Sequence, residues 1–328
     1  KKQIVWIMVS IPILIAIIAI DYELLIKIAP ILYGIIILLL AGVLFTTPIN
    51  GATSWYNIGA VSFQPAELAK IVIILSLTYT IVKIQARGKK EINVIYKLAI
   101  ILGVAMVPVL LIIKQPDYGT AIAFIMALIF MLFVAGIDKK YIIIAIAVVI
   151  VAVPLLYFFI LPEHAKTRID VYLNPNLDPR GAGYNIIQSK LAIGAGQLFG
   201  MGLLKGNQTQ LGFLYPKTTD FIFSVIGEEL GFIFAAGIIV LYVVLITKAI
   251  YVAKTAKDLE GSYIAAGIAG IFFFHMLENI GMTMGLLPIT GIPLPFVSYG
   301  GSSLLSNIIM IGILLNISGR RQKVLFIE

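Results

Sequence analysis

The sequence contains no cysteine, which excludes a disulfide framework, a thiolate nucleophile and a cysteine-based metal site. It contains two histidines, His164 and His275, which are too far apart in sequence to indicate a histidine-rich metal centre. Charged residues are also scarce, at 12%, whereas 60% of the residues are hydrophobic and the mean hydropathy is +1.05. A soluble core formed by 328 residues could not bury so much apolar surface. The composition therefore predicts a polytopic membrane protein.

Apolar runs of membrane-spanning length recur along the whole chain. A helix needs on the order of 20 residues to cross the hydrocarbon layer. By that measure we expect an all-α membrane protein with about nine transmembrane helices, at residues 3–20, 24–45, 66–84, 98–113, 118–136, 141–161, 220–247, 262–284 and 303–318.

The basic residues indicate how these helices are oriented. In a soluble protein, the net charge of +8 could suggest nucleic-acid binding. Here the lysines and arginines lie in alternate connections between the spans, so we expect no nucleic-acid partner. The connections 46–65 and 285–302 contain no lysine or arginine. The connections that do contain them, and with them the C-terminus, are therefore expected in the cytoplasm. Nine spans would put Lys1 and Lys2 outside, so we expect a further span ahead of them. The basic residues expected on the cytoplasmic side are Lys27, Lys83, Arg87, Lys89, Lys90, Lys97, Lys139, Lys140, Lys248, Lys254, Lys257, Arg320, Arg321 and Lys323.

We expect a single integral membrane domain in three segments: N-terminal spans at 1–161, a long extracytoplasmic loop at 162–219 and C-terminal spans at 220–328. A loop of this length in a compact membrane protein is usually functional. Within it, Ile186 to Ala195 fits an amphipathic interfacial helix with Gln188, Ser189 and Lys190 on its polar side. The loop cations could bind phosphate or pyrophosphate, although long outer loops also tolerate cations without function. They are Lys166, Arg168, Arg180, Lys190, Lys205 and Lys217.

The stretch from Tyr215 to Gly231 joins this loop to the next span. Helical spacing predicts that Asp220, Ser224, Gly227 and Gly231 share one small, polar face. An equally weighted alternative is that Asp220, with its neighbouring threonines, only caps the helix. The proline- and glycine-rich connection 285–302 is too irregular for one helix, and such backbone is tolerated at membrane depth only against protein or a wet cavity. We expect it to line the same cavity as Asp220.

A few other polar residues occur in or beside the spans. Glu67 and Lys70 lie three residues apart on one helical face, either as a structural ion pair or as part of a cavity lining. Asp117 is expected to cap the helix that follows it. Trp55 suits an interface anchor. Glu228 and Glu229 are adjacent carboxylates that cannot share one helical face and are costly inside a membrane.

Five motifs in order give the chain a resemblance to a known family. They are FQPAELAK at 63–70, KQPDYGTA at 114–121, NPNLDPRGAGYNIIQSKLAIGAGQLFGMGL at 174–203, TDFIFSVIGEELG at 219–231 and TGIPLPFVSYGGSS at 290–303. Together they resemble the SEDS family (shape, elongation, division and sporulation), and QTQLGFLYP at 208–216 is more similar to its RodA branch than to its FtsW branch. Members of this family have ten spans with both ends cytoplasmic, which agrees with a further span ahead of Lys1.

The resemblance implies a peptidoglycan glycosyltransferase of the cytoplasmic membrane that faces outward and polymerises lipid II during cell elongation. It also implies two further partners, an undecaprenyl-pyrophosphate-linked glycan and a class B penicillin-binding protein. The family's essential aspartate falls on Asp220. Ser54 and the run Pro216-Lys217-Thr218 depart from the family pattern. The resemblance and the loop chemistry together predict substrate contacts at Trp55, Glu67, Lys70, Gln188, Ser189, Lys190, Lys205, Lys217, Thr219, Ser298 and Ser302.

The substrate's chemistry suggests a mechanism with one base. Pyrophosphate is a good leaving group, so the acid of the usual carboxylate pair can be absent. Asp220 would accept the proton of the acceptor's 4-hydroxyl, while Lys205 or Lys217, or a divalent cation (Mg²⁺ or Mn²⁺) partly bound by Asp220, offsets charge on the departing pyrophosphate. A lipid-precursor flippase is the alternative, because Glu67, Lys70, Glu228, Glu229 and Glu278 also suit a coupled carrier. A third hypothesis is a non-catalytic scaffold.

Overall fold

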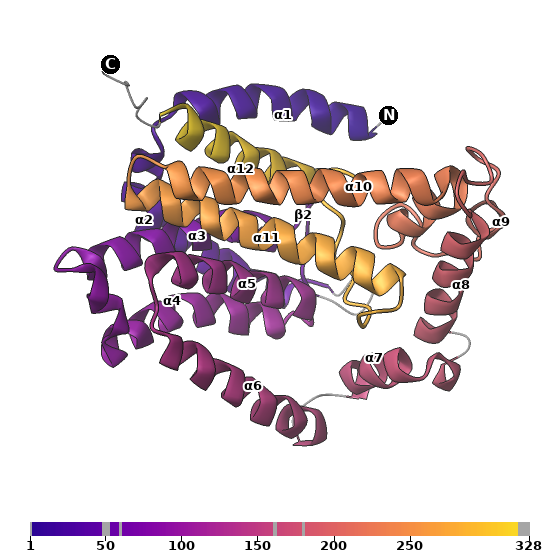
Figure 1. Ribbon diagram of the computed structural model, residues 1–328, viewed down its shortest axis with the longest axis horizontal. Coiled ribbons are helices and arrows are strands. Elements are labelled where there is room, and N and C mark those ends of the chain that lie inside the picture. The colour runs from indigo at the N-terminus through magenta and orange to yellow at the C-terminus, as the bar shows by residue number, and fades with distance from the viewer. Residues whose placement is uncertain (1, 48–52, 59–60, 160–162, 179–180, 321–328) are drawn as a thin grey trace, which may run out of the picture. The chain divides into compact units, whose positions relative to one another are not determined.

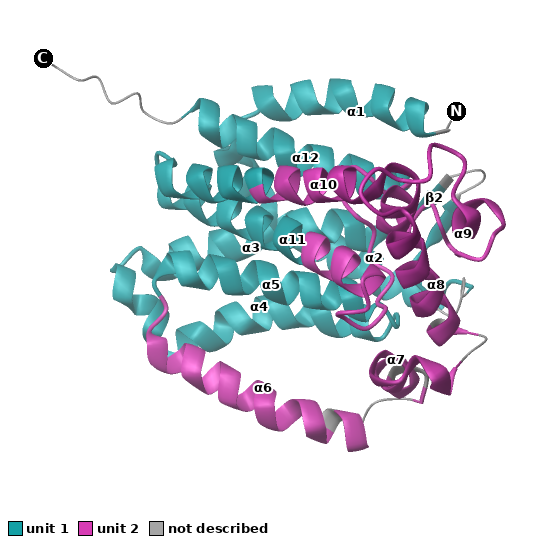
Figure 2. Ribbon diagram, turned by 45° about the vertical axis from the view of Figure 1, so that its right-hand side comes forward, with its two compact units in different colours: residues 1–136, 244–274, 300–328 teal, residues 137–243, 275–299 magenta. Residues whose placement is uncertain are grey.

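The computed structural model describes residues 2–47, 53–58, 61–159, 163–178 and 181–320. The described chain is almost entirely helical, as its composition predicts (Figure 1). It divides into two compact units, which are coloured separately in Figure 2. Unit 1 comprises 1–136, 244–274 and 300–328, and unit 2 comprises 137–243 and 275–299.

Unit 1 is built around one largely buried helix, α3 (Pro65–Gln85), which packs against α2, α4, α5 and α12. Proline at the first position of α3 suits a helix start, where its missing N–H is not needed. A short hairpin, β1 (Tyr56–Ile58) and β2 (Val61–Phe63), precedes it. The remaining elements are α1 (Lys2–Ala19), α2 (Tyr22–Gly42), η1 (Val43–Phe45), η2 (Lys89–Asn93), α4 (Ile95–Ile113), α5 (Tyr118–Ala135) and α12 (Gly301–Gly319), with parts of α10 and α11.

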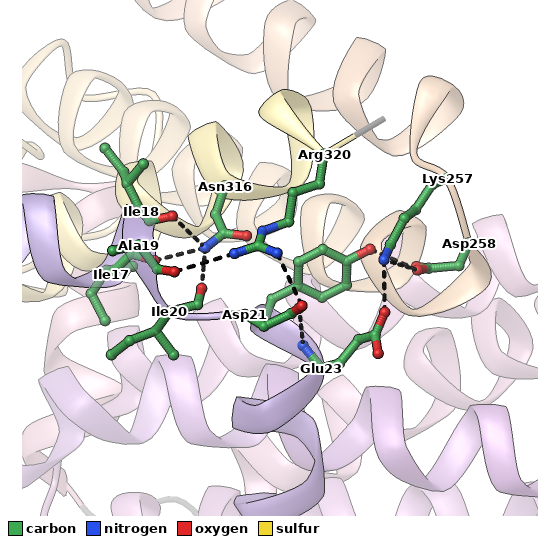
Figure 3. Close-up of polar contacts among 11 residues, drawn as sticks. Ile17, Ile18, Ala19, Ile20, Asp21, Glu23, Lys257, Asp258, Asn316 and Arg320 are labelled. Carbon is green, nitrogen blue, oxygen red and sulfur yellow. Dashed lines mark hydrogen bonds and ion pairs between the residues drawn. The ribbon is translucent and has the colours of Figure 1, made fainter. Parts of the chain in front are cut away.

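A polar cluster joins three chain segments at one end of unit 1 (Figure 3). The Asn316 side chain in α12 donates hydrogen bonds to the Ile17 and Ile18 carbonyls in the last turn of α1. Arg320 pairs with Asp21, in the turn between α1 and α2, at 3.0 Å. Lys257, in the turn between α10 and α11, pairs with Glu23 at 2.7 Å. Paired charges and satisfied carbonyls therefore hold these helix ends together.

Unit 2 contains the long loop, and helices occupy much of it. Its elements are α6 (Lys139–Phe159), α7 (Glu163–Leu173), η3 (Pro175–Leu177), α8 (Ala182–Ala195) and α9 (Asn207–Gln210), together with the first part of α10 (Ile222–Thr255) and the end of α11 (Leu259–Thr283). The predicted amphipathic helix at Ile186 to Ala195 is thus part of a longer helix, α8. The 285–300 connection follows α11 and forms turns and irregular backbone, as predicted.

Seven helices in the described residues are long and apolar enough to cross a membrane: α2 (with η1), α4, α5, α6, α10, α11 and α12. The two other predicted spans also form helices. The described apolar part of α1, Gln3–Ala19, is shorter, and α3 is not among the seven. The predicted count of nine spans is therefore not confirmed, although the described residues of each predicted span are largely helical.

Two details of the predicted Asp220 helix are wrong. Helix α10 begins at Ile222, so Asp220 lies in the turn that precedes it. Gly231 has a left-handed φ of 82° with ψ of −176°, which interrupts the helix. Asp220, Ser224, Gly227 and Gly231 consequently do not form one continuous helical face, because the spacing argument holds only where every residue between them is helical.

Candidate functional site

Asp220 is half-buried in the turn that leads into α10. Burial raises the pKa of its carboxyl group, while a hydrogen bond from Thr219 and the positive charge of Arg168 act in the opposite direction. Helix α10 begins at Ile222, which puts Phe221 at the N-cap position and Asp220 one residue ahead of it. This position does not favour the capping alternative. The turn thus presents a carboxylate with raised proton affinity.

Residues from α11 and the connection after it form hydrogen bonds to the backbone of this turn. Asn279 of α11 donates from Nδ2 to the Asp220 carbonyl at 3.0 Å. Ser298 donates from Oγ to the Thr219 carbonyl at 2.7 Å. The Tyr299 amide donates to the Thr218 carbonyl at 2.9 Å. Three consecutive carbonyls are therefore bonded to groups from α11 and the 285–300 connection. The predicted Ser298 and Thr219 lie at this junction and contact each other.

The 285–300 connection also approaches the Asp220 side chain, while the cavity that both were expected to line stays a prediction. Gly291 has a left-handed φ of 78°, and a Cβ placed there would be 3.4 Å from Asp220 Oδ2. The same Asn279 amide also donates to the Ile292 carbonyl, at 2.8 Å. Thr290 donates to the buried Glu278 carboxylate at 2.7 Å. Short polar bonds to α11 thus set the path of the backbone beside Asp220.

Among the described residues, the cation that acts on the Asp220 carboxyl is Arg168 of α7. Its Nη1 donates to the Ile289 carbonyl at 3.5 Å, two residues from Gly291. In the same connection, Tyr172 of α7 donates from its hydroxyl to the Leu286 carbonyl at 3.0 Å. Arg168 was one of six loop cations in the sequence, and no local signal distinguished it from the others. Only the folded position of α7 selects it.

The lysines predicted to bind substrate differ in their surroundings. Lys190 is exposed, and the end of its side chain lies against Gly285: a Cβ placed on this glycine would be 2.5 Å from Lys190 Nζ. Lys205 is exposed. Lys217 donates from Nζ to the Thr209 carbonyl at 2.8 Å, so its ammonium group is bonded to the loop. Arg180 lies outside the described residues. Lys190 therefore borders the 285–300 connection, whereas Lys217 is bonded to the loop.

The structure corrects the predicted environment of Ser189. The sequence predicts Ser189 on the polar side of an interfacial helix, but the residue is fully buried. Its hydroxyl shares a hydrogen bond of 2.6 Å with Ser224 and donates to the Thr283 carbonyl, also at 2.6 Å. Gln188 beside it is half-buried. Ser189 thus joins α8 to α10 and α11 instead of facing the interface, since its hydroxyl can satisfy a helix-end carbonyl.

The other predicted binding residues belong to unit 1. Lys70 Nζ lies 2.7 Å from Glu67 Oε2 and only 1% of the Lys70 side chain is exposed. Ser306 of α12 donates to the same oxygen at 2.5 Å. Such burial favours the structural ion pair over a cavity lining. Trp55 is half-exposed just ahead of β1, and Ser302 donates to the Ser62 carbonyl at 3.4 Å.

Asp117 behaves as predicted and caps α5. Its carboxylate accepts from the Thr120 amide at 3.1 Å, and Gln64 donates to its other oxygen at 3.2 Å. Burial raises the pKa of this carboxyl, against the effect of the Thr120 bond.

The described residues contain no group of three or more histidine, aspartate or glutamate side chains that could hold a metal ion. Among the described residues, the charged group that acts on the pKa of the Asp220 carboxyl is a cation, Arg168. These residues do not fit a protein-built divalent-cation site.

Comparison with known proteins gives consistent results. A model of the FtsW, RodA and SpoVE family, described as cell cycle protein, matches residues 1–323. Peptidoglycan glycosyltransferase MrdB of Escherichia coli strain K12 is 40% identical over 295 residues, covering 90% of this chain and 78% of its own. Peptidoglycan glycosyltransferase RodA of Treponema pallidum is 31% identical over 392 residues, covering 98% and 89%.

Solved structures give the same pattern. A chain from a study of the structural coordination of polymerization and crosslinking by a peptidoglycan synthase complex has a TM-score of 0.84 at 28% identity, covering 98% of this chain and 90% of that one. The rod shape determining protein RodA of Thermus thermophilus has a TM-score of 0.72 at 27% identity, covering 98% and 88%. Fold and sequence thus agree along nearly the whole chain.

Proposed function

This chain belongs to the FtsW, RodA and SpoVE family of cell cycle proteins, and we propose that it polymerises lipid II into glycan strands during cell elongation. It is a multi-pass membrane protein and a peptidoglycan glycosyltransferase, like the relatives it matches. The observation that carries the proposal is the Asp220 carboxylate, which is half-buried beside Arg168 and Gly291 in a turn held by hydrogen bonds.

In the proposed reaction, the 4-hydroxyl oxygen of the acceptor sugar attacks the anomeric carbon of the lipid-linked donor. The bond from that carbon to the pyrophosphate oxygen breaks, and its electron pair leaves with the pyrophosphate. The hydroxyl proton passes to Asp220. Its raised pKa suits this base, because a carboxylate of ordinary pKa accepts a proton weakly. The attack inverts the anomeric centre.

The proposal includes partners and an orientation. Class B penicillin-binding proteins crosslink glycan strands, and the structural relative comes from a complex that both polymerises and crosslinks. We infer that this chain works with such a transpeptidase and that its substrate and product are lipid II and an undecaprenyl-pyrophosphate-linked glycan. We also infer a cytoplasmic C-terminus and an outward-facing Asp220, on the distribution of lysine and arginine.

A divalent cation stays a separate proposal. Asp220 alone could supply one ligand, with the remaining ligands coming from pyrophosphate oxygens and water. Polymerisation measured in the presence of a chelator, then with Mg²⁺ or Mn²⁺ restored, tests this proposal. Unchanged rates throughout would contradict it.

The carrier alternative has less support in the structure than in the sequence. Glu67 pairs with Lys70, Glu228 and Glu229 accept backbone hydrogen bonds, and Glu278 accepts from Thr290. Carboxylates with such partners are explained without a transported ion. The decisive test supplies labelled lipid II to purified protein in liposomes together with its transpeptidase. We expect glycan polymer; flipping of lipid II without any polymer would contradict the proposed function.

We expect Arg168→Gln to lower the polymerisation rate by about 10- to 100-fold, because a cation that faces the departing pyrophosphate would be lost. The substitution also removes the positive charge that lowers the pKa of Asp220, so this pKa rises further. The Asp220 carboxylate must be ionised to act as a base. As the solution is acidified, the variant is therefore expected to lose activity at a higher pH than the wild type does.

Rates measured across pH for Arg168→Gln and wild type test this prediction. Lys166→Gln is the matched control, because Lys166 lies on the same helix but pairs with Glu163 at 3.3 Å. A wild-type rate and pH profile in Arg168→Gln would remove Arg168 from the site.

A further inference from the structure

The interruption of α10 at Gly231 leaves backbone groups that the preceding loop satisfies. The Phe232 amide donates to the Gln197 carbonyl at 2.8 Å, and the Ile233 amide donates to the Leu198 carbonyl at 3.3 Å. A Cβ at Gly231 would lie 2.3 Å from the Gly200 nitrogen, so the approach requires glycine. The loop is therefore attached to α10 at the break. In an unbroken helix these two amides would bond within the helix and could not hold the loop.

Glu228 strengthens this attachment by capping α9 from outside that helix. Its side chain is fully buried. One carboxylate oxygen accepts from the Gln208 amide at 2.7 Å, and the other accepts from the Thr209 amide at 3.0 Å and the Thr209 hydroxyl at 2.5 Å. Hydrogen bonds between backbone amides and a carboxylate are among the strong ones, and here they compensate for burying a charge.

Glu229 does the same for the neighbouring part of the loop. Its carboxylate accepts from the Leu204 amide at 3.0 Å and from Gln210 Nε2 at 2.8 Å. Two backbone bonds accompany it, from Met201 to the Glu228 carbonyl at 2.9 Å and from Gly202 to the Glu229 carbonyl at 3.0 Å. Burying two adjacent carboxylates costs free energy, and here each of them accepts at least two hydrogen bonds from residues 204–210.

The attached loop is in turn bonded to the segment that contains Asp220. Lys217 donates from Nζ to the Thr209 carbonyl at 2.8 Å. Thr209 is itself 2% exposed and held by Glu228. Lys217 precedes Asp220 by three residues, so a displacement of α9 would be passed to the Asp220 turn through one hydrogen bond and three peptide units. All these residues belong to unit 2.

We propose that Glu228 and Glu229 are positioning residues for glycan polymerisation, which fix residues 197–210 to α10 and, through Thr209 and Lys217, hold the Asp220 turn in place. The loop then forms a fixed side of the site during turnover, not a lid. This inference rests on the proposed function for its catalytic part, whereas the attachment of the loop stands independently of any activity.

Limited trypsin digestion of the purified, membrane-reconstituted protein tests the attachment. Cleavage after the exposed Lys205 requires the loop to open locally, so its rate reports the opening equilibrium. We expect Glu228→Ala and Glu229→Ala each to accelerate this cleavage by about 10-fold or more, the order expected when buried charge-assisted hydrogen bonds are lost. Glu163→Gln, which alters an exposed carboxylate on α7, is expected to cleave as the wild type does. Unchanged cleavage in both alanine variants would overturn the proposal.

Polymerisation of labelled lipid II tests the link to Asp220, and Thr209 offers a matched pair of mild variants. Thr209→Ser keeps the hydroxyl that donates to Glu228, whereas Thr209→Val removes it. We expect Thr209→Val to lower kcat about 10-fold with little change in KM, because a misplaced base affects the reaction step more than substrate binding, and Thr209→Ser to restore wild-type kcat.

A double-mutant cycle tests whether the effect passes through Lys217. If it does, Glu228→Ala and Lys217→Met together lower kcat by no more than about the larger single effect; full additivity would contradict the link. Faster cleavage with wild-type kcat in Glu228→Ala would also overturn the positioning role. If the wild type made no polymer, the proposed function would fail, and the cleavage rates would still decide whether these carboxylates hold the loop.

Discussion

Asp220→Asn is expected to lower the rate of glycan polymerisation by about 10³-fold, within the range that general-base catalysis contributes. Asparagine has nearly the same shape and keeps an oxygen that can accept the Thr219 hydrogen bond, but it cannot accept the hydroxyl proton. The backbone bonds from Asn279, Ser298 and Tyr299 do not involve the altered group, so the turn is expected to keep its conformation. The measurement is polymer formed per unit time from labelled lipid II.

The matched control is Asp138→Asn, which removes a carboxylate from an exposed pair with Lys140 at 3.5 Å. It is expected to polymerise at the wild-type rate, because exposed ion pairs contribute little. Undiminished polymer from Asp220→Asn would remove this carboxylate from the chemistry.

The wild-type pH profile provides an independent check on Asp220. Burial raises the pKa of its carboxyl above the ordinary value. The base is active when ionised, so the rate is expected to decline, as pH falls, at a pH above the ordinary aspartate value of about 3.9. A rate that stays constant down to that value would contradict the assignment.

Glu67→Gln is expected to lower the free energy of unfolding by about 3–5 kcal/mol, because it leaves the buried Lys70 ammonium without its charged partner. Lys70→Met is expected to cost a similar amount, since the buried Glu67 carboxylate then loses its cation. Glu67 keeps the hydrogen bond from Ser306, which does not neutralise its charge. Thermal unfolding of the purified protein in detergent, with the order of midpoints compared among variants, checks the prediction.

The double variant Glu67→Gln with Lys70→Met separates a structural pair from a binding role. Removing both charges at similar volume is often neutral, so we expect it to recover most of the stability lost in either single variant. Polymerisation by the double variant then tests the predicted substrate contact directly. If Glu67→Gln unfolded at the wild-type midpoint, the pair would lie in a wet cavity and the structural role would be wrong.

Local spacing predicted contacts between residues close in sequence. Glu67 and Lys70 pair because positions three apart on a helix adjoin each other. Asp117 caps α5 because its carboxylate reaches the amide three residues on. The same rule was wrong for the face from Asp220 to Gly231. Gly231 leaves the helical conformation there, and only the approach of residues 197–200 shows why the break is stable.

The partners of Asp220 could not be predicted in this way. Arg168 is 52 positions away and Asn279 is 59 positions away in the opposite direction, so no local periodicity relates either residue to it. The polarity of serine predicts Ser189 on the polar side of an interfacial helix, yet its hydroxyl is buried against Ser224 and the Thr283 carbonyl. Polarity in a sequence does not indicate whether a hydroxyl meets water or a helix-end carbonyl.

The sequence by itself determined that this protein is helical and membrane-embedded, because hydrophobicity along a single segment and the need to satisfy backbone groups in lipid act within each helix. Its ordered motifs also indicated the family and Asp220. Only the tertiary structure decided which of the described loop cations acts on that carboxylate, and that Glu228 and Glu229 hold a loop. The physical reason is that a carboxylate selects its donors by distance in space, which the order of residues along the chain does not specify.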